Sequence, residues 1–307
     1  MNAGTWRVVR PLAGGAILVA VLVAAGPGTV LGSFRSLDGA SVAAAAVIGA
    51  MTTACAAWRW QVVAGRLGLH LRLPAAVAGC YRSQFLNATL PGGVLGDVQR
   101  GVAQGRAADA VGLGLRSVAW DRTTGFVVLA AVTVPTVVLQ QVRTPPGVGP
   151  GWAIGVAALV GVLALPAARP LRRAVRRAAA VAGADVRTLA APRAGTAVIV
   201  ASVLVVAGHV ATFGLAARSV GVHLEGSALV ALALPVLLLG ALPTNVAGWG
   251  PREGAAAWVF AEAGSGASRG VAVAVAYGVI ALVATLPGAG LLALAAVRGV
   301  RGGAEHG

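Results

Sequence analysis

The sequence predicts an all-α polytopic membrane protein with about six full transmembrane helices and two re-entrant hairpins, which form an inverted-topology repeat. Three observations lead to this prediction: an apolar composition, apolar runs of membrane-spanning length, and a short polar motif that occurs twice. Of the 307 residues, 58% are hydrophobic and 11% are charged, with a mean hydropathy of +0.84. Soluble domains carry about 25% charged residues, so we expect lipid to be the solvent of this chain.

Eight apolar runs follow one another along the chain, and two of them are short. A helix needs about 20 residues to cross a bilayer. Run 75–90 is short and contains Arg82 and Gln84, and run 227–242 is short and carries Pro235. We expect both short runs to enter and leave the membrane on one side; if both crossed it, there would be eight spans. The other six runs are predicted spans, at 12–32, 41–64, 117–139, 151–168, 194–217 and 271–297.

The distribution of arginine sets the expected orientation. All 24 basic residues are arginine, and the loop 169–193 alone holds seven of them. Cytoplasmic loops carry the excess of basic residues, so six spans with both termini in the cytoplasm put this loop inside, in the cell membrane. Few arginines then remain outside: Arg35, Arg143, Arg218, Arg252 and Arg269. The net charge of +15 is explained by this anchoring, and we expect no nucleic-acid partner.

The residue types that build enzymatic or metal sites are sparse. Cys55 and Cys80 stand in no metal-binding spacing, and the four histidines are scattered. We therefore predict no catalytic residue, no metal site and no cofactor. Tryptophans near the ends of predicted helices fit the aromatic belts of a membrane protein: Trp58, Trp60, Trp152 and Trp249.

A motif of the form L-P-x-x-V-x-G occurs in each half of the chain. It runs from Leu90 to Gly96 and again from Leu242 to Gly248, 152 residues later. An acid and an arginine follow each copy. The predicted topology places the two copies on opposite sides of the membrane, as in transporters built from inverted repeats. We expect one membrane domain, 1–307, with repeats at 41–139 and 194–297 and a connecting helix and basic loop at 140–193.

At these residues the chain resembles the transmembrane region of lysylphosphatidylglycerol synthases, a flippase-like family that also occurs as stand-alone membrane proteins. The resemblance covers nearly the whole chain. Asp121-Arg122 stands where the family usually has Glu-Arg. The other residues that carry it are Asn87, Leu90-Pro91-Gly92, Gly96-Asp97, Arg100, Leu242-Pro243, the stretch from Gly248 to Glu253, and Leu286-Pro287-Gly288. The full synthases add a soluble aminoacyl-transfer domain, which we do not expect after Gly307, so their synthetic activity is not carried over.

The candidate substrate-binding residues are polar groups at or near the two motifs: Asn87, Asp97, Arg100, Asp121, Arg122, Arg252 and Glu253. The three arginines Arg100, Arg122 and Arg252 are predicted phosphate partners, because guanidinium binds phosphate through two parallel hydrogen bonds. The acids would hold these arginines or contact a cationic aminoacyl group; alternatively, Asp97–Arg100 and Asp121–Arg122 are internal ion pairs. Backbone and hinge positions complete the prediction: Pro91, Gly92, Gly93, Gly96, Pro243, Gly248 and Gly250.

The resemblance implies a lipid flippase or transporter. Its partners would be anionic or aminoacylated phospholipids, or polyprenyl-linked lipids, with large polar headgroups. The alternative is a non-catalytic membrane subunit that presents lipid to a partner glycosyltransferase or acyltransferase. A charged residue in the bilayer costs about 2.5 kcal/mol or more, so a polar headgroup needs a path lined by compensating charges in either case.

Overall fold

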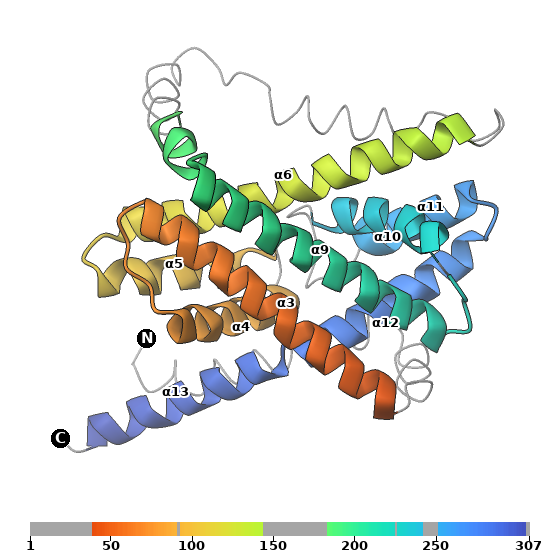
Figure 1. Cartoon of the computed structure of the whole chain (residues 1–307). Helices are drawn as coiled ribbons and strands as arrows, with labels where there is room; N and C mark the ends of the chain where they lie inside the picture. Colours follow the sequence, from red (N-terminus) through yellow and green to blue (C-terminus); the bar gives the residue numbers. More distant parts are fainter. Residues whose placement is uncertain (1–38, 91–92, 144–182, 225, 242–250, 305–307) are drawn as a thin grey trace, which may run out of the picture.

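The computed structural model describes residues 39–90, 93–143, 183–224, 226–241 and 251–304, and within these ranges all regular secondary structure is helical (Figure 1). The all-α prediction is therefore confirmed for the described residues. The predicted runs 12–32 and 151–168 lie outside them. The helices are α3 Gly39–Arg66, α4 Leu73–Thr89, α5 Leu95–Ala107, α6 Val111–Arg143, α9 Pro192–Ser219, α10 Gly226–Gly240, α11 Pro251–Glu262, α12 Ala267–Ala284 and α13 Leu286–Ala304.

Four stretches of the described chain are long and apolar enough to cross a membrane. They are Gly39–Arg66, Val111–Leu139, Pro192–Ser219 and Ala267–Val297, the last of which joins α12 to α13. Each coincides with a predicted span. By contrast, the short runs form α4 and α10, with 17 and 15 residues, fewer than the roughly 20 that a full crossing requires. The chain is a multi-pass membrane protein.

Helices of similar length follow the same order in the two parts of the chain. A long helix, two short helices and a second long stretch occur as α3, α4, α5 and α6, and again as α9, α10, α11 and the α12–α13 stretch. The first helix of each set has 28 residues. The two short helices of each set pack against each other, and the second short helix packs against the long helix that follows it.

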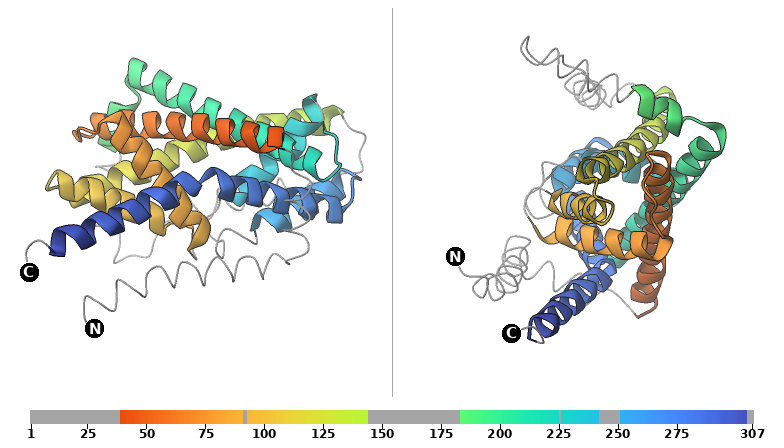
Figure 2. Two further views of the ribbon diagram at one scale, coloured as in Figure 1. Left: turned by 90° about the horizontal axis from the view of Figure 1, so that it is seen from below. Right: turned by 90° about the vertical axis from the view of Figure 1, so that its left-hand side faces the viewer.

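The helices α3 and α9 form the main contact between the two sets. They run antiparallel and side by side (Figure 1), along one side of the bundle (Figure 2). Close packing is possible because Gly208 has no side chain: a Cβ there would lie 2.1 Å from Cγ2 of Thr52. Further along the pair, Val63 of α3 and Val198 of α9 belong to one buried cluster.

The short helices lie toward opposite ends of the bundle. In Figure 1, α4 and α5 are on the left and α10 and α11 are on the right. Each set also reaches into the other: α10 packs against α6, and α13 packs against α4. At the second contact a Cβ on Gly288 would be 2.1 Å from the carbonyl oxygen of Tyr81, so this glycine of the Leu-Pro-Gly sequence brings the two backbones together.

The buried core is mostly small and aliphatic, with aromatic side chains at its two centres. Phe213, Phe260 and Tyr277 form the aromatic part of one centre, between α9, α11 and α12. Trp60 lies in the other, where it is 2% exposed and donates from Nε1 to Ser117 Oγ at 3.1 Å. The prediction of an interfacial position for Trp60 is wrong, because its side of α3 faces α4 and α6 rather than lipid. Trp58, two residues earlier, is 36% exposed.

Candidate functional site

A buried carboxylate on α6 joins two arginines from different helices. Asp121 accepts from Arg59 Nε at 2.8 Å and from Arg100 Nη2 at 3.0 Å, one contact on each carboxylate oxygen. The three side chains come from α3, α5 and α6, and all are at least nine-tenths buried. Arg59 also donates from Nη1 to Ser202 Oγ on α9 at 3.2 Å. This polar connection therefore reaches from the first set of helices to the second.

A second carboxylate, Asp97, lies one turn before Arg100 on α5. Its Oδ1 accepts from Ser83 Oγ at 2.8 Å and from Arg100 Nη2 at 3.1 Å. Its Oδ2 accepts from Asn87 Nδ2 at 2.9 Å and from Arg122 Nη2 at 2.5 Å. With four donors around two oxygens, Asp97 connects α4, α5 and α6.

Asn87 connects the end of α4 to the start of α5. Its side-chain oxygen accepts from the backbone N–H of Gly96 at 2.8 Å, while its amide nitrogen donates to Asp97. Between the two helices, Gly93 has a φ of 61°, a left-handed conformation that glycine adopts without steric penalty. The turn between the helices therefore depends on Asn87 and Gly93 together. The predicted hinge residues Pro91 and Gly92 lie outside the described residues.

Arg122 differs from the other arginines of the network in its exposure. Its side chain is 56% exposed, whereas that of Arg100 is 4% exposed. Arg100 also stacks over the Trp60 ring, with Cζ 4.4 Å from the centroid, and donates from Nη1 to Cys80 Sγ at 3.1 Å. Arg100 is thus fixed in the interior, and Arg122 has its guanidinium at the edge of the network.

The ion pairs agree only partly with those expected from the sequence. The predicted Asp97–Arg100 pair is present. The alternative Asp121–Arg122 pair is replaced, because Asp121 pairs with Arg59 and Arg100, and Arg122 pairs with Asp97. Consecutive residues on an α-helix point about 100° apart. Asp121 therefore faces the interior while Arg122 faces the rim.

In the second set of helices, the predicted residues Arg252 and Glu253 lie in the first turn of α11. Arg252 Nη2 and Glu253 Oε1 are 2.7 Å apart, and each side chain is 15% exposed. The guanidinium carbon of Arg252 lies 5.2 Å from the centroid of the Tyr277 ring on α12. The Tyr277 hydroxyl in turn lies 2.8 Å from His209 Nδ1 on α9. Pro243, Gly248 and Gly250 lie outside the described residues.

The polar residues just described form one cluster in each set of helices, and each cluster joins the corresponding three helices of its set. In the first set, Arg100 of the second short helix, α5, donates to Asp121 of the following long helix, α6. Asp121 in turn accepts from Arg59 of the preceding long helix, α3. In the second, the corresponding residues are Arg252, Tyr277 and His209. The chemistry differs, since the first cluster is ionic and the second is aromatic and hydrogen-bonded.

Sequence reasoning missed Arg59, Ser83 and Ser202. Arg59 had a detectable signal, since it is an arginine within the apolar run 41–64, and charged residues inside membrane segments are rare and expected to be paired. The two serines carried no such signal, because serine is common on helix–helix contacts in membrane proteins. The described residues contain no group of His, Cys, Asp and Glu side chains that could hold a metal ion.

Comparison with known protein families assigns most of the chain to one family. The model of the lysylphosphatidylglycerol synthase transmembrane region matches residues 11–288, which include every residue of both clusters. Neither the curated proteins nor the solved structures contain a match to this chain. The family match confirms the resemblance carried by the two motifs. The chain belongs to the family of the lysylphosphatidylglycerol synthase transmembrane region.

Proposed function

We propose that this protein binds membrane lipids with polar, phosphate-containing headgroups and moves them across the bilayer. The family is one of membrane proteins related to lysylphosphatidylglycerol, and this membership supports a lipid substrate. The observation that carries the proposal is the network of Arg59, Asp97, Arg100, Asp121 and Arg122, which joins charged side chains from three helices. Anionic or aminoacylated phospholipids and polyprenyl-linked lipids share the phosphate that such a network would recognise.

The charge of the network favours an anionic ligand. Three guanidinium groups and two carboxylates leave one net positive charge among these five residues. An uncompensated charge within a bilayer is costly, and a phosphate would neutralise it. In addition, Arg100 Nε has no acceptor within the described part of the chain although the side chain is 4% exposed. The network therefore has both an unbalanced charge and an unsatisfied donor.

Arg122 is the residue that we assign to first contact with the headgroup. Its exposed guanidinium is held by one carboxylate, Asp97, so a phosphate can share it without disrupting Asp121. Arginine offers a planar fork that matches phosphate oxygens. Arg100 and Asp97 would then hold Arg122 in place and supply further charge to the bound headgroup, and Asn87 would position Asp97.

The position of the network along the spans supports translocation rather than surface binding. Asp121 lies ten residues into the span that begins at Val111, about 15 Å along a helix. The hydrocarbon core of a bilayer is about 30 Å thick. Because the apolar run of this helix begins at 117, a headgroup at Arg122 would lie inside the hydrocarbon core, as the substrates of transporters built from inverted repeats do.

We further propose that α4–α5 and α10–α11 are re-entrant hairpins of two inverted repeats. Their helices are too short to cross a membrane, and they lie toward opposite ends of the bundle (Figure 1). A helix begins at or just after each motif: α5 begins within the first motif, at Leu95, and α11 begins at Pro251, three residues after the second motif ends at Gly248. The N-termini of these helices would point positive dipole ends toward an anion, and the motif glycines would let backbone amides approach it.

The test is lipid translocation by the purified protein in vesicles. Fluorescent phosphatidylglycerol and phosphatidylcholine would be followed by chemical quenching of the probe in the outer leaflet. We expect the wild-type protein to accelerate exchange of the anionic lipid, and Arg122→Gln to slow it about tenfold, since a hydrogen bond to a charged group contributes about 1.5–3 kcal/mol. Arg106→Gln is the matched control, because Arg106 is an exposed arginine at the end of α5.

Equal rates for Arg122→Gln and Arg106→Gln, with both variants folded, would overturn the assignment of Arg122. A wild-type protein that binds the labelled lipid without accelerating its exchange would overturn translocation. That second outcome would favour the alternative, a membrane subunit that presents lipid to an enzyme, and copurification with a glycosyltransferase or acyltransferase would then be expected.

A further inference from the structure

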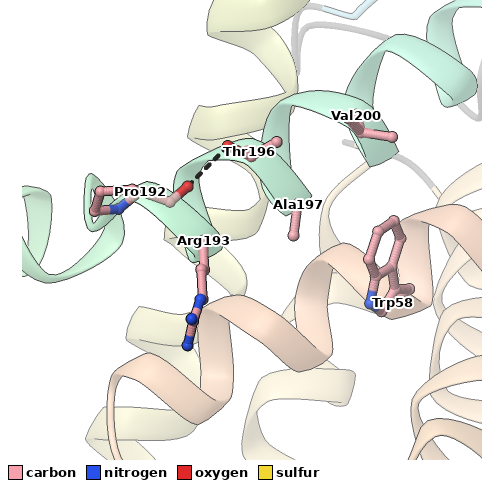
Figure 3. A pocket seen from close by; sticks show the side chains of 6 residues that line it. All are labelled: Trp58, Pro192, Arg193, Thr196, Ala197 and Val200. Atoms are coloured by element: carbon pink, nitrogen blue, oxygen red, sulfur yellow. Dashed lines mark hydrogen bonds between the residues drawn. The ribbon is translucent and has the colours of Figure 1, made fainter.

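A shallow groove lies between α3 and α9, on the outer side of the bundle. It has a volume of about 470 Å³ and is lined by six residues: Trp58, Pro192, Arg193, Thr196, Ala197 and Val200. Figure 3 shows Arg193 extending from α9 toward α3, and Trp58 beside Ala197 and Val200. None of these residues belongs to the ion network described above, and Arg59, next to Trp58, faces the interior instead.

The groove has a polar end and an apolar end. Arg193 lies in the first turn of α9, and Val200 lies seven residues further along the same helix, which is about 10 Å along the axis. Because α9 is a candidate span that starts at Pro192, Arg193 is at the level where the span begins and Val200 is inside the apolar region. Trp58 is eight residues before the end of α3 at Arg66, so it lies beside the apolar half of the groove.

The charge of this end of the groove favours an anion. The lining includes one arginine and no carboxylate. Two further exposed arginines belong to the same end of the helix pair, Arg66 in the last turn of α3 and Arg187 shortly before α9. Basic residues at the start of a membrane span attract anionic lipids, by about 1 kcal/mol for each residue, whereas a zwitterionic headgroup gains little from the same field.

We infer that this groove is a lateral binding site for an anionic glycerophospholipid, separate from the proposed translocation path. The headgroup phosphate pairs with Arg193, and one acyl chain lies along Ala197, Val200 and the Trp58 ring. A lipid bound in this way contacts both helices of the main interface between the two sets and stabilises their association. The site requires only that α3 and α9 cross a membrane, so it stands whether or not the protein translocates lipid.

The test uses tryptophan fluorescence of the full-length protein in phosphatidylcholine vesicles. Brominated phosphatidylglycerol or brominated phosphatidylcholine is added at equal fractions as a quencher. The signal of Trp58 is the difference between the wild-type protein and Trp58→Phe. We expect this signal to be quenched more strongly by the brominated anionic lipid, with a preference of about fivefold in apparent binding, and Arg193→Gln to remove most of that preference.

Arg187→Gln is the matched control, because it removes the same charge from an exposed residue outside the groove. It should lower the preference for the anionic lipid less than Arg193→Gln does, because Arg187 adds to the charge at this end of the helix pair but does not line the groove. Equal quenching by the two brominated lipids, or equal loss of preference in Arg193→Gln and Arg187→Gln, would overturn the site. This experiment measures equilibrium binding at the groove, so a negative result would leave the separate proposal for Arg122 standing.

Discussion

Arg59 and Asp121 lie 62 residues apart in the sequence and form a buried ion pair, with 2.8 Å between Nε and Oδ1. Their side chains are 8% and 3% exposed. Because the same carboxylate also pairs with Arg100, one acid on α6 neutralises arginines from both α3 and α5. The packing of these three helices and the charge balance of the proposed site therefore depend on a single residue.

The first prediction concerns this residue. Asp121→Asn removes the negative charge from between two buried guanidinium groups and should lower stability by about 3 kcal/mol or more, because breaking a buried ion pair leaves a charge uncompensated. Thermal unfolding in detergent measures the effect. Asp109→Asn is the control: Asp109 is exposed and has a φ of 50°, a conformation that asparagine tolerates. Similar unfolding temperatures for both variants would contradict the central role of Asp121.

The second prediction concerns the close approach of α4 and α5. A Cβ on Gly96 would lie 2.1 Å from the carbonyl oxygen of Ser83, an overlap that neither backbone can relieve without separating the two helices. Gly96→Ala should therefore displace Asp97 from Ser83 and destabilise the protein. Gly112→Ala, where a Cβ meets nothing within 4 Å, should be neutral or slightly stabilising, since alanine favours helix more than glycine does. Thermal unfolding and translocation rates of the two variants check this difference.

The third prediction concerns the hydrogen bond in the second set of helices. Tyr277→Phe removes the hydroxyl that contacts His209 Nδ1 and should cost about 1 kcal/mol, the net contribution of one hydrogen bond. Tyr81→Phe is the control, because the Tyr81 hydroxyl makes no hydrogen bond within the described residues. A loss of stability that is equal in the two variants would show that the 2.8 Å contact contributes nothing specific.

The fourth prediction tests the proposed inverted topology. Cysteines introduced at the exposed positions Ala108, between α5 and α6, and Ser268, at the start of α12, should react with a membrane-impermeant reagent from opposite sides. The parent protein supplies the background from Cys80, which is buried, and from the partly exposed Cys55. Labelling of both positions from one side of the membrane would defeat the inverted arrangement.

Much of the architecture could be predicted from the sequence because it depends on local composition. Four spans are helices within a few residues of the predicted runs, since a long apolar stretch in lipid must satisfy its own backbone hydrogen bonds. The two short runs were recognised by their length, and the polar residues at the first motif indicated Asn87, Asp97 and Arg100, which the structure brings together. The paired motifs also indicated the family.

The tertiary structure alone decided which of these residues are partners and which face the rim. Arg59 pairs with Asp121, Arg122 pairs with Asp97, and Trp60 faces the interior instead of the membrane surface. These contacts depend on the rotation of each helix about its axis and on the register between helices that are distant in sequence. Apolar composition carries little information on either, because in lipid the apolar faces of a helix are nearly equivalent and packing and polar contacts choose among them.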